Sequence, residues 1–319
     1  MSCGCELAST EAAVSAAVAW RAAMASDTGL QRANNEDRVY MDDARGVFLV
    51  IDGVGGHSAG EQAAEIAVET IPSALDGSGS VEERVRGAIT AANNRIYEAA
   101  QENQDWRGMA CVLTLAVADD DRVTVGHVGD SRLYLVWNGA VKKLTSDHSP
   151  VGEQEDQGAL TELQAMVHPR RNEVFRDVGS RPHEPYDEEF IQIKSFPLHP
   201  EAALLLCSDG LSDVLTSAEI GSIVEQYEGE PSKVAQMLVE AANEAGGKDN
   251  VSVIFVAGPE FIGTASRTMA EARSRHGATR MRKARKAWRV WLARIAWLVA
   301  GVILGAVCWA WLIERRLVP

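Results

Sequence analysis

Apolar residues recur along the chain with two different periods, and the two periods occur in blocks. Short runs rich in β-branched and aromatic residues predict strands at Val47–Ile51, Val112–Ala118, Val123–Val128, Leu133–Trp137, Phe190–Ile193, Ala203–Cys207 and Val251–Val256. Amphipathic stretches predict helices at Gly60–Leu75, Val81–Gln101, Ala218–Gln226 and Ser232–Ala245. Because the strands do not alternate strictly with helices, the pattern favours an α+β sandwich of sheets and helices over a doubly wound parallel sheet.

Two local features refine this prediction. The gap between the third and fourth runs is short, which is typical of an antiparallel pair formed by 123–128 and 133–137. Pro231 precedes the last predicted helix and Gly246-Gly247 follows it, as expected for a helix start and stop. The alanine-rich stretch Glu11–Ala25 fits either a helix or a strand.

The longest apolar stretch lies near the C-terminus, where Ile295–Ile313 holds 19 residues without a charge. As a helix it spans about 28 Å, close to the roughly 30 Å hydrocarbon core of a bilayer. Tryptophans gather toward its two ends, as interfacial anchors do, at positions 288, 291, 297, 309 and 311. We therefore predict a transmembrane helix over 288–313, with a buried core helix as the alternative.

Charge divides the chain into an acidic body and a basic C-terminal part. Of 31 Lys/Arg and 45 Asp/Glu in all, 12 and 2 lie between Arg267 and Arg316, a net +10, which leaves residues 1–266 with 19 and 43, a net −24. An acidic body argues against nucleic-acid binding. Ten basic residues lie at 267–294 and two follow the apolar stretch, so the positive-inside rule places residues 1–294 in the cytoplasm.

Several acidic residues stand at or beside the ends of apolar runs. They are Asp37, Asp52, Asp130, Asp209 and Asp249. Any one of them alone is more often a turn or cap residue. The ends of neighbouring strands meet at one rim of a sheet, where gathered carboxylates repel one another unless a cation neutralises them. Oxygen ligands without Cys or paired His select Mg²⁺ or Mn²⁺ over zinc.

Six short motifs, taken in order, resemble the metal-dependent protein phosphatase family, type 2C (PPM), in its bacterial form. They are TGLQRANNEDRVY (28–40), VIDGVGGHSAGEQAA (50–64), VGHVGDSRLYLVWNG (125–139), KLTSDHSPV (143–151), CSDGLSD (207–213) and KDNVSVIFV (248–256). Six motifs in order across roughly 20–257 make chance a poor explanation. The resemblance implies two stacked antiparallel β-sheets flanked by helices, an α-β-β-α sandwich, with a metal centre at one end.

The resemblance also implies which residues hold two Mn²⁺ or Mg²⁺ ions. Asp52 bridges both ions and the Gly53 carbonyl binds one of them, while Asp209 and Asp249 complete the pair. Such a centre activates a bridging water, which attacks the phosphorus atom directly and in line without a phosphoenzyme.

Further residues acquire roles from the same resemblance. Glu36 and Asp37 supply ligands, partly through water, and Asp130 holds a weaker third ion with Asp209 in some members. Arg32 takes the substrate phosphate, for which a guanidinium fork is suited. A plain surface side chain is the competing interpretation, since that is the commonest fate of an arginine.

The general acid stays open. Some members carry a histidine directly after the Asp-Gly pair, where this chain has Val54, and His57 is the only histidine nearby. His57 protonates the leaving alkoxide, steadies the loop, or does neither, because geometry decides such roles. The stretch Ser149–His183 covers the mobile flap of the family, and His148 is interpreted as a packing or turn residue.

The sequence therefore predicts a membrane-tethered protein Ser/Thr phosphatase on the cytoplasmic face of a bacterial inner membrane. Its expected partners are phosphorylated Ser/Thr proteins, targets of a partner kinase. A catalytically weak or inactive phosphoprotein-binding module on the same fold, or a small-molecule phosphatase, are the alternatives. The predicted organisation is a flexible N-terminus at 1–14, the phosphatase domain at 15–257, a basic linker at 258–287, the transmembrane helix at 288–313 and a short tail at 314–319.

Overall fold

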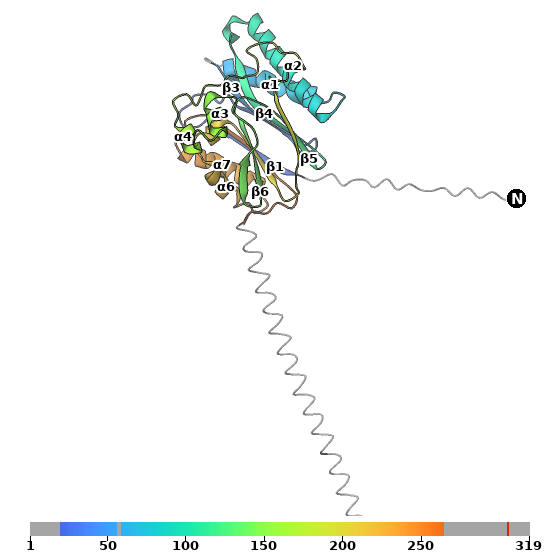
Figure 1. Cartoon of the computed structure of the whole chain (residues 1–319), viewed down its shortest axis with the longest axis vertical. Helices are drawn as coiled ribbons and strands as arrows, with labels where there is room; N and C mark the ends of the chain where they lie inside the picture. Colours follow the sequence, from blue (N-terminus) through green and yellow to red (C-terminus); the bar gives the residue numbers. More distant parts are fainter. Residues whose placement is uncertain (1–19, 56–58, 265–304, 306–319) are drawn as a thin grey trace, which may run out of the picture. The chain divides into compact units, whose positions relative to one another are not determined.

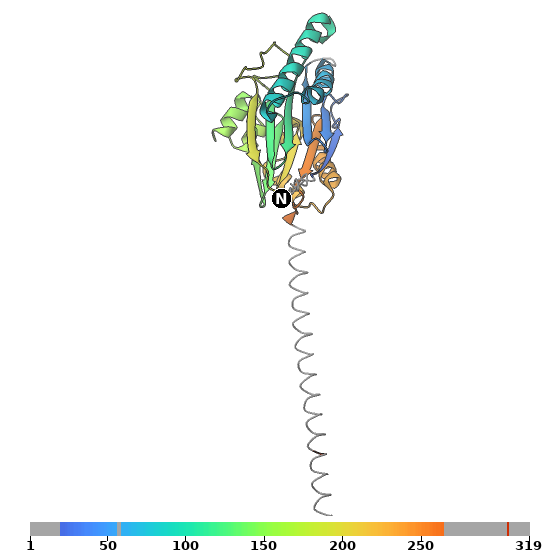
Figure 2. The ribbon, with the colours of Figure 1, turned by 90° about the vertical axis from the view of Figure 1, so that its right-hand side faces the viewer.

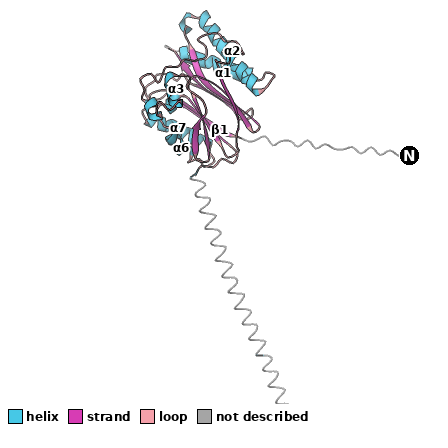
Figure 3. Ribbon diagram, in the orientation of Figure 1, coloured by secondary structure: helices cyan, strands magenta, loops and turns pink. Residues whose placement is uncertain are grey.

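Two stacked β-sheets with helices on their outer faces form the body of the protein (Figure 1, Figure 3). The computed structural model describes residues 20–55, 59–264 and 305, and one compact unit ends at Thr264. This arrangement confirms the predicted α-β-β-α sandwich. Within the described residues no helix is long and apolar enough to cross a membrane; the predicted span 288–313 lies outside them, apart from Gly305.

Each sheet has five strands, and every neighbouring pair is antiparallel. The first sheet has the order β1-β10-β9-β6-β7, formed by Arg21–Asp27, Val251–Ala257, Ala203–Cys207, Arg132–Trp137 and Ala140–Lys143. The second has the order β2-β3-β4-β5-β8, formed by Arg38–Asp42, Val47–Val54, Ala110–Asp119, Arg122–Val128 and Gln192–Pro197.

Helices pack on the outer face of each sheet (Figure 2). The second sheet is covered by α1 (Ala59–Ala74) and α2 (Val81–Glu102), and the first by α6 (Ser217–Val224) and α7 (Pro231–Glu244). The remaining helices are short: η1 (Gln104–Trp106), α3 (Pro150–Asp156), α4 (Glu162–Met166) and α5 (Asp209–Ser212).

The core has three layers because central strands bury both of their faces. In β3, Leu49 and Ile51 pack against α1 and α2, while Phe48 and Val50 face the first sheet. This explains why the strand is a continuous apolar run without alternation. Side chains between the two sheets form the middle layer of the core. The third layer lies between the first sheet and the helices α6 and α7.

Local signals fix the ends of the main helices. Ser80 caps α2 through a capping box with Glu83. The Ser80 hydroxyl accepts from the backbone N–H of Glu83, and the Glu83 carboxylate accepts from the backbone N–H of Ser80. The prediction for α7 is shifted by one residue at each end, since Pro231 is its first residue and Glu244 its last. The two glycines that follow it, Gly246 and Gly247, have φ values of 128° and 49°, which favour glycine and end the helix.

One prediction about pairing was wrong. The runs 123–128 and 133–137 do not pair, since β5 pairs with β4 and β8, whereas β6 pairs with β7 and β9. The turn between them carries the chain from one sheet to the other through Gly129, whose φ is 108°. A side chain there would overlap Val112, so the crossing requires glycine.

Candidate metal centre and active site

Five acidic side chains gather at one end of the sandwich, where strands of both sheets begin or end. Asp37 precedes β2, Asp52 lies near the end of β3, Asp130 precedes β6, Asp209 follows β9 and Asp249 precedes β10. Antiparallel pairing places the end of one strand beside the start of the next. Burial, followed by the charges of the other four acids, raises the pKa of Asp52. The five acids therefore lie close enough to interact electrostatically, and their roles as metal ligands stay a prediction.

Asp37 is the most enclosed of them, with an exposed fraction of 3%. Its Oδ2 accepts a hydrogen bond from the Ser208 hydroxyl at 2.8 Å, while its Oδ1 is buried without a hydrogen-bond partner among the described residues. Burial raises the pKa of Asp37 to about 7, against hydrogen bonds from two serines and with help from neighbouring charges. A buried carboxyl oxygen without a donor is suited to a cation or to its bound water.

Asp52, Asp130 and Asp209 are each half-buried, so one side of each carboxyl group faces an accessible space. Burial and the charge of Asp249 raise the pKa of Asp209, and a hydrogen bond with Asp52 lowers it in part. Adjacent carboxylates repel each other, so either a proton or a cation is needed to stabilise them together. A divalent cation between them removes that repulsion without the proton.

Glycine is required beside two of the acids because other backbone approaches closely. A Cβ on Gly53 would lie 2.8 Å from the carbonyl oxygen of Glu36 and would also overlap Gly60. A Cβ on Gly210, the residue after Asp209, would overlap the carbonyl oxygen of Asn250. These contacts bring the Asp-Gly pairs of β3 and α5 against the segments that carry the remaining acids.

Asn250 holds one of these segments in place. Its Oδ1 accepts a hydrogen bond from the Glu36 backbone at 2.8 Å, and its Nδ2 donates to the carbonyl groups of Thr28 and Asn34 at 2.9 and 2.8 Å. The side chain is 5% exposed, and all three bonds join the start of β10 to the loop before β2. The role of Asn250 could not be predicted from the sequence, where its only signal is its place beside Asp249 in KDNVSV.

Arg32 lies at the rim of the acidic group with half of its side chain exposed. Its Nη2 is 2.7 Å from Oδ2 of Asp249. Burial lowers the pKa of Arg32, but the hydrogen bond and charge of Asp249 outweigh it and raise the pKa. Since a guanidinium has five N–H donors, this contact leaves donors available for a second anion.

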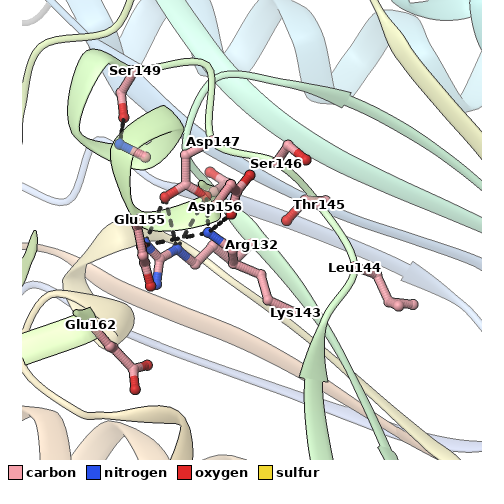
Figure 4. Close-up of polar contacts among 12 residues, drawn as sticks. Arg132, Lys143, Leu144, Thr145, Ser146, Asp147, Ser149, Glu155, Asp156 and Glu162 are labelled. Atoms are coloured by element: carbon pink, nitrogen blue, oxygen red, sulfur yellow. Dashed lines mark hydrogen bonds and ion pairs between the residues drawn. The ribbon is translucent and has the colours of Figure 1, made fainter. Parts of the chain in front are cut away.

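A buried ion network is centred on Arg132 of β6, two residues after Asp130 (Figure 4). Arg132 is 8% exposed and forms ion pairs with Asp147 at 2.6 Å and with Glu155 at 2.9 Å. Lys143 adds an ion pair with Asp156 at 2.9 Å. The network joins β6 and β7 to α3, which is the first helix of the predicted flap.

Two buried histidines steady the turn that carries Asp130. The backbone N–H of Gly129 donates to Nδ1 of His148 at 3.0 Å, and the ring of His127 lies 4.9 Å from that of His148. Burial lowers the pKa of His127 to about 4 and, together with nearby positive charge, that of His148 to about 3. Both rings are therefore neutral at pH 7 and serve packing, as predicted for His148.

The stretch 149–183 reaches the acidic group through Arg171. Arg171 forms an ion pair with Asp213, and its charge lowers the pKa of Asp209 in part. Asp130, Asp209 and Arg171 line a cavity of about 20 Å³, which has room for one water molecule or ion. Sequence reasoning missed Arg171, because nothing in the local pattern tells which flap residue turns inward.

The carboxylate and carbonyl oxygens of the centre are the ligand type that hard divalent cations prefer. Among residues 20–55 and 59–264, no three His, Cys, Asp or Glu side chains form a ready-made metal site. The buried Oδ1 of Asp37 is nevertheless an oxygen ligand without a hydrogen-bond partner among the described residues. Oxygen-only ligands of this kind favour Mg²⁺ or Mn²⁺. His57 lies outside the described residues.

Comparisons with known proteins agree with this geometry. The family model for protein phosphatase 2C matches residues 30–245. The serine/threonine phosphatase stp of Listeria innocua is 34% identical over 242 residues, which cover 72% of this chain and 93% of the relative.

Solved structures are similar over the same region. The serine/threonine phosphatase PstP/Ppp of Mycobacterium tuberculosis has a TM-score of 0.67 at 32% identity and covers 75% of this chain and 98% of its own. A structure of the PstP catalytic domain in complex with 2 manganese ions has a TM-score of 0.66 at 30% identity, covering 75% of this chain and 97% of its own.

Proposed function

Because the chain belongs to the protein phosphatase 2C family and is a phosphoprotein phosphatase, we propose that its acidic centre hydrolyses phosphoserine and phosphothreonine. The enzyme uses two Mn²⁺ or Mg²⁺ ions, as in the manganese complex of PstP. When bound, these ions neutralise the phosphate dianion and activate a water molecule for in-line attack. The enclosed Oδ1 of Asp37 carries the proposal, since it has no hydrogen-bond partner among the described residues and offers a buried oxygen ligand to a cation at the acidic centre.

Each residue of the centre has a separate part in this proposal. Asp52, the Gly53 carbonyl and Asp209 hold the ions, and Asp249 binds one of them while it orients Arg32 through their 2.7 Å ion pair. Glu36 and Asp37 bind through water, which suits the enclosed Oδ1 of Asp37. Asp130, on the cavity beside Asp209, holds a weaker third ion.

Arg32 binds the phosphate of the substrate. Its side chain is 50% exposed and one end of its guanidinium pairs with Asp249, so its other N–H groups are available to a ligand. A bidentate guanidinium–phosphate contact is strong and directional. It also supplies positive charge that a phosphorylated substrate needs on a body with a net charge of −24 over residues 1–266.

The site is tested by replacing Asp52 and Asp209 with asparagine, which removes the negative charge and keeps the size of the side chain. Asp52→Asn and Asp209→Asn should abolish Mn²⁺-dependent release of phosphate from a phosphothreonine peptide. The matched control is Asp76→Asn, because Asp76 is an exposed acid that pairs with Arg45 and lies outside the centre. Normal turnover in either site variant would refute the assignment. Peptide binding without turnover in the wild type would indicate a phosphoprotein-binding module, and faster hydrolysis of nucleotides than of phosphopeptides a small-molecule phosphatase.

We further propose that residues 288–313 anchor the enzyme to a bacterial inner membrane with the catalytic domain in the cytoplasm, where it opposes a Ser/Thr kinase. The uncharged 19-residue stretch, its flanking tryptophans and the basic residues before it support this proposal. The test is membrane fractionation of the full chain and of a chain that ends at Thr264, which retains the buried Phe261. Only the full chain should sediment with membranes; recovery of both in the membrane fraction would contradict the anchor.

A further inference from the structure

A groove lies between the edges of the two sheets, away from the acidic centre. It is open to solvent, has a volume of about 640 Å³, and is formed by β6, β7, β8 and the residues that follow β8. Partly buried apolar side chains line it, namely Leu135, Leu144 and Phe196. At one end Trp137 stacks on His199, with ring centroids 4.5 Å apart, and 36% of the tryptophan remains exposed.

The groove is positively charged on a body that is otherwise strongly acidic. Lys142, Lys143 and Lys194 line it, and no Asp or Glu among the described residues does. Lys143 belongs to the ion network with Asp156, whereas neither Lys142 nor Lys194 forms an ion pair within the described part of the chain. Lys194 instead donates to the carbonyl oxygen of Leu144 at 2.7 Å. Two ammonium groups are thus available to an acidic ligand.

The backbone beside the groove also has hydrogen-bonding groups to offer. β7 is the edge strand of the first sheet and β8 the edge strand of the second, so each pairs with a strand on one side only. An edge strand presents N–H and C=O groups that an extended peptide can pair with. Apolar, aromatic and cationic side chains between two such edges form a surface suited to an extended acidic peptide with an apolar residue.

We propose that this groove docks an extended acidic segment of the phosphoprotein substrate, with a large apolar side chain against Trp137, while the phosphorylated residue lies at the metal centre. This proposal rests on the proposed function. β6 connects the two places, since it begins two residues after Asp130 and ends at Trp137. At about 3.3 Å per residue, the groove lies roughly 20 Å from the centre.

A docking site at this distance has a distinct kinetic signature. It strengthens the binding of a substrate that reaches both places, so it lowers KM and leaves the chemical step unchanged. It has no effect on a small substrate that occupies the metal centre alone. A residue needed only for stability would change the hydrolysis of both kinds of substrate alike.

The experiment compares matched substrates with the full chain in detergent micelles and Mn²⁺. One phosphothreonine peptide carries a 12-residue Gly/Ser linker, which reaches about 40 Å when extended, followed by a tail of alternating Glu and Leu. A second peptide has Gln in place of each Glu, and p-nitrophenyl phosphate reports the centre alone. The variants are Lys142→Glu and Trp137→Ala, with Lys233→Glu as the matched control because Lys233 is an exposed lysine on α7.

In the wild type the acidic tail should lower KM about three- to tenfold relative to the Gln tail, because its Glu residues can pair with the two available lysines while the Leu residues are the same in both tails. Lys142→Glu should remove most of that difference and Trp137→Ala should raise KM for both tailed peptides. Lys233→Glu should behave as the wild type, and kcat/KM for p-nitrophenyl phosphate should stay constant throughout.

Three results would overturn the proposal. These are equal KM values for the two tails in the wild type, an unchanged preference in Lys142→Glu, or an equal loss in Lys233→Glu. Binding of phosphatidylglycerol vesicles that depends on Lys142, without any tail preference, would make the groove a lipid site instead. Failure of every form to hydrolyse p-nitrophenyl phosphate would refute the proposed function, whereas normal hydrolysis with no tail preference would refute the docking site alone.

Discussion

The carboxyl group of Asp37 makes the stability of the metal-free protein depend on pH. Burial raises its pKa from 3.8 to about 7, so the folded protein binds this proton more tightly than the unfolded chain does. The resulting stabilisation is full below about pH 4 and is lost as the pH rises toward 7. At neutral pH the fold therefore carries a buried negative charge that a cation neutralises.

Asp37→Asn should consequently stabilise the protein in EDTA at pH 7.5, by an amount on the order of a few kcal/mol. The gain should vanish near pH 4, where Asp37 is protonated, and Mn²⁺ should raise the Tm of the wild type more than that of the variant. Thermal unfolding at both pH values, with EDTA and with Mn²⁺, measures these differences. Asp76→Asn is the control, and an Asp37→Asn gain that does not change with pH would contradict the argument.

Asn250 is predicted to control the metal centre without binding metal. Asn250→Ala removes three hydrogen bonds to the loop at 28–36 and should lower the free energy of unfolding by about 1–3 kcal/mol. Because that loop carries Arg32 and Glu36, the variant should also bind Mn²⁺ more weakly and show a raised KM for phosphopeptides.

Asn93→Ala provides the matched control for this experiment. Asn93 is fully buried and bonds to Gly179 and Arg181 at 2.7 and 2.8 Å, far along the chain from the loop. It should lose stability to a similar degree while its affinity for Mn²⁺, measured by calorimetry, stays that of the wild type. Equal losses of Mn²⁺ affinity in both variants would show that Asn250 does not position the metal centre.

At the level of elements, the ion network of Arg132 fastens the first flap helix to the sheet. Arg132→Met removes the shorter ion pairs of Asp147 and Glu155 and leaves them only Lys143, at 3.6 and 3.5 Å, which should cost at most about 3–5 kcal/mol of unfolding free energy. Arg170→Met removes an exposed Arg–Glu pair and should cost less than about 1 kcal/mol. Chemical denaturation of both variants makes the comparison, and similar losses would mean that burial of the network contributes nothing.

How well each strand could be predicted depended on its burial. β9 matches its predicted limits because all five residues are buried and apolar. The strand predicted at Phe190–Ile193 starts two residues before β8, which is Gln192–Pro197. The apolar signal came from Phe190, which is a buried core residue before the strand, whereas β8 itself is a half-exposed edge strand. β2 and β7 were missed for the same reason, since neither contains a fully buried residue.

The candidate site divides in a similar way. The acids could be predicted because strand ends and neighbouring glycines mark them in the sequence. Asn250 and Arg171 could not, because their parts depend on contacts with segments far along the chain, at Glu36 and Asp213. The crossing at Gly129 was misread since a short gap between two apolar runs also fits a hairpin.

At the scale of the whole molecule, the layer between the sheets should act as one cooperative core. Leu206 on β9 is fully buried in that layer and pairs with Ile254 and Leu133 on either side. Leu206→Ala should cost about 2–5 kcal/mol and shift a single unfolding transition seen alike by circular dichroism and fluorescence. Leu163→Ala, at a 65% exposed position, should change little; separate transitions for the two sheets would contradict a shared core.

The pairing of β1 with β10 has a further consequence. Arg21 lies directly opposite Ala257, and both are at the end of their sheet that is remote from Asp209 and Asp249. In an antiparallel pair such residues are only about 5 Å apart. A linker placed after the buried Phe261 can therefore return to Arg21, and new ends can be opened in an exposed turn such as the one at Gly158. Sequences fused at either end of this domain therefore lie far from the catalytic centre, and they can be exchanged without a change in its chemistry.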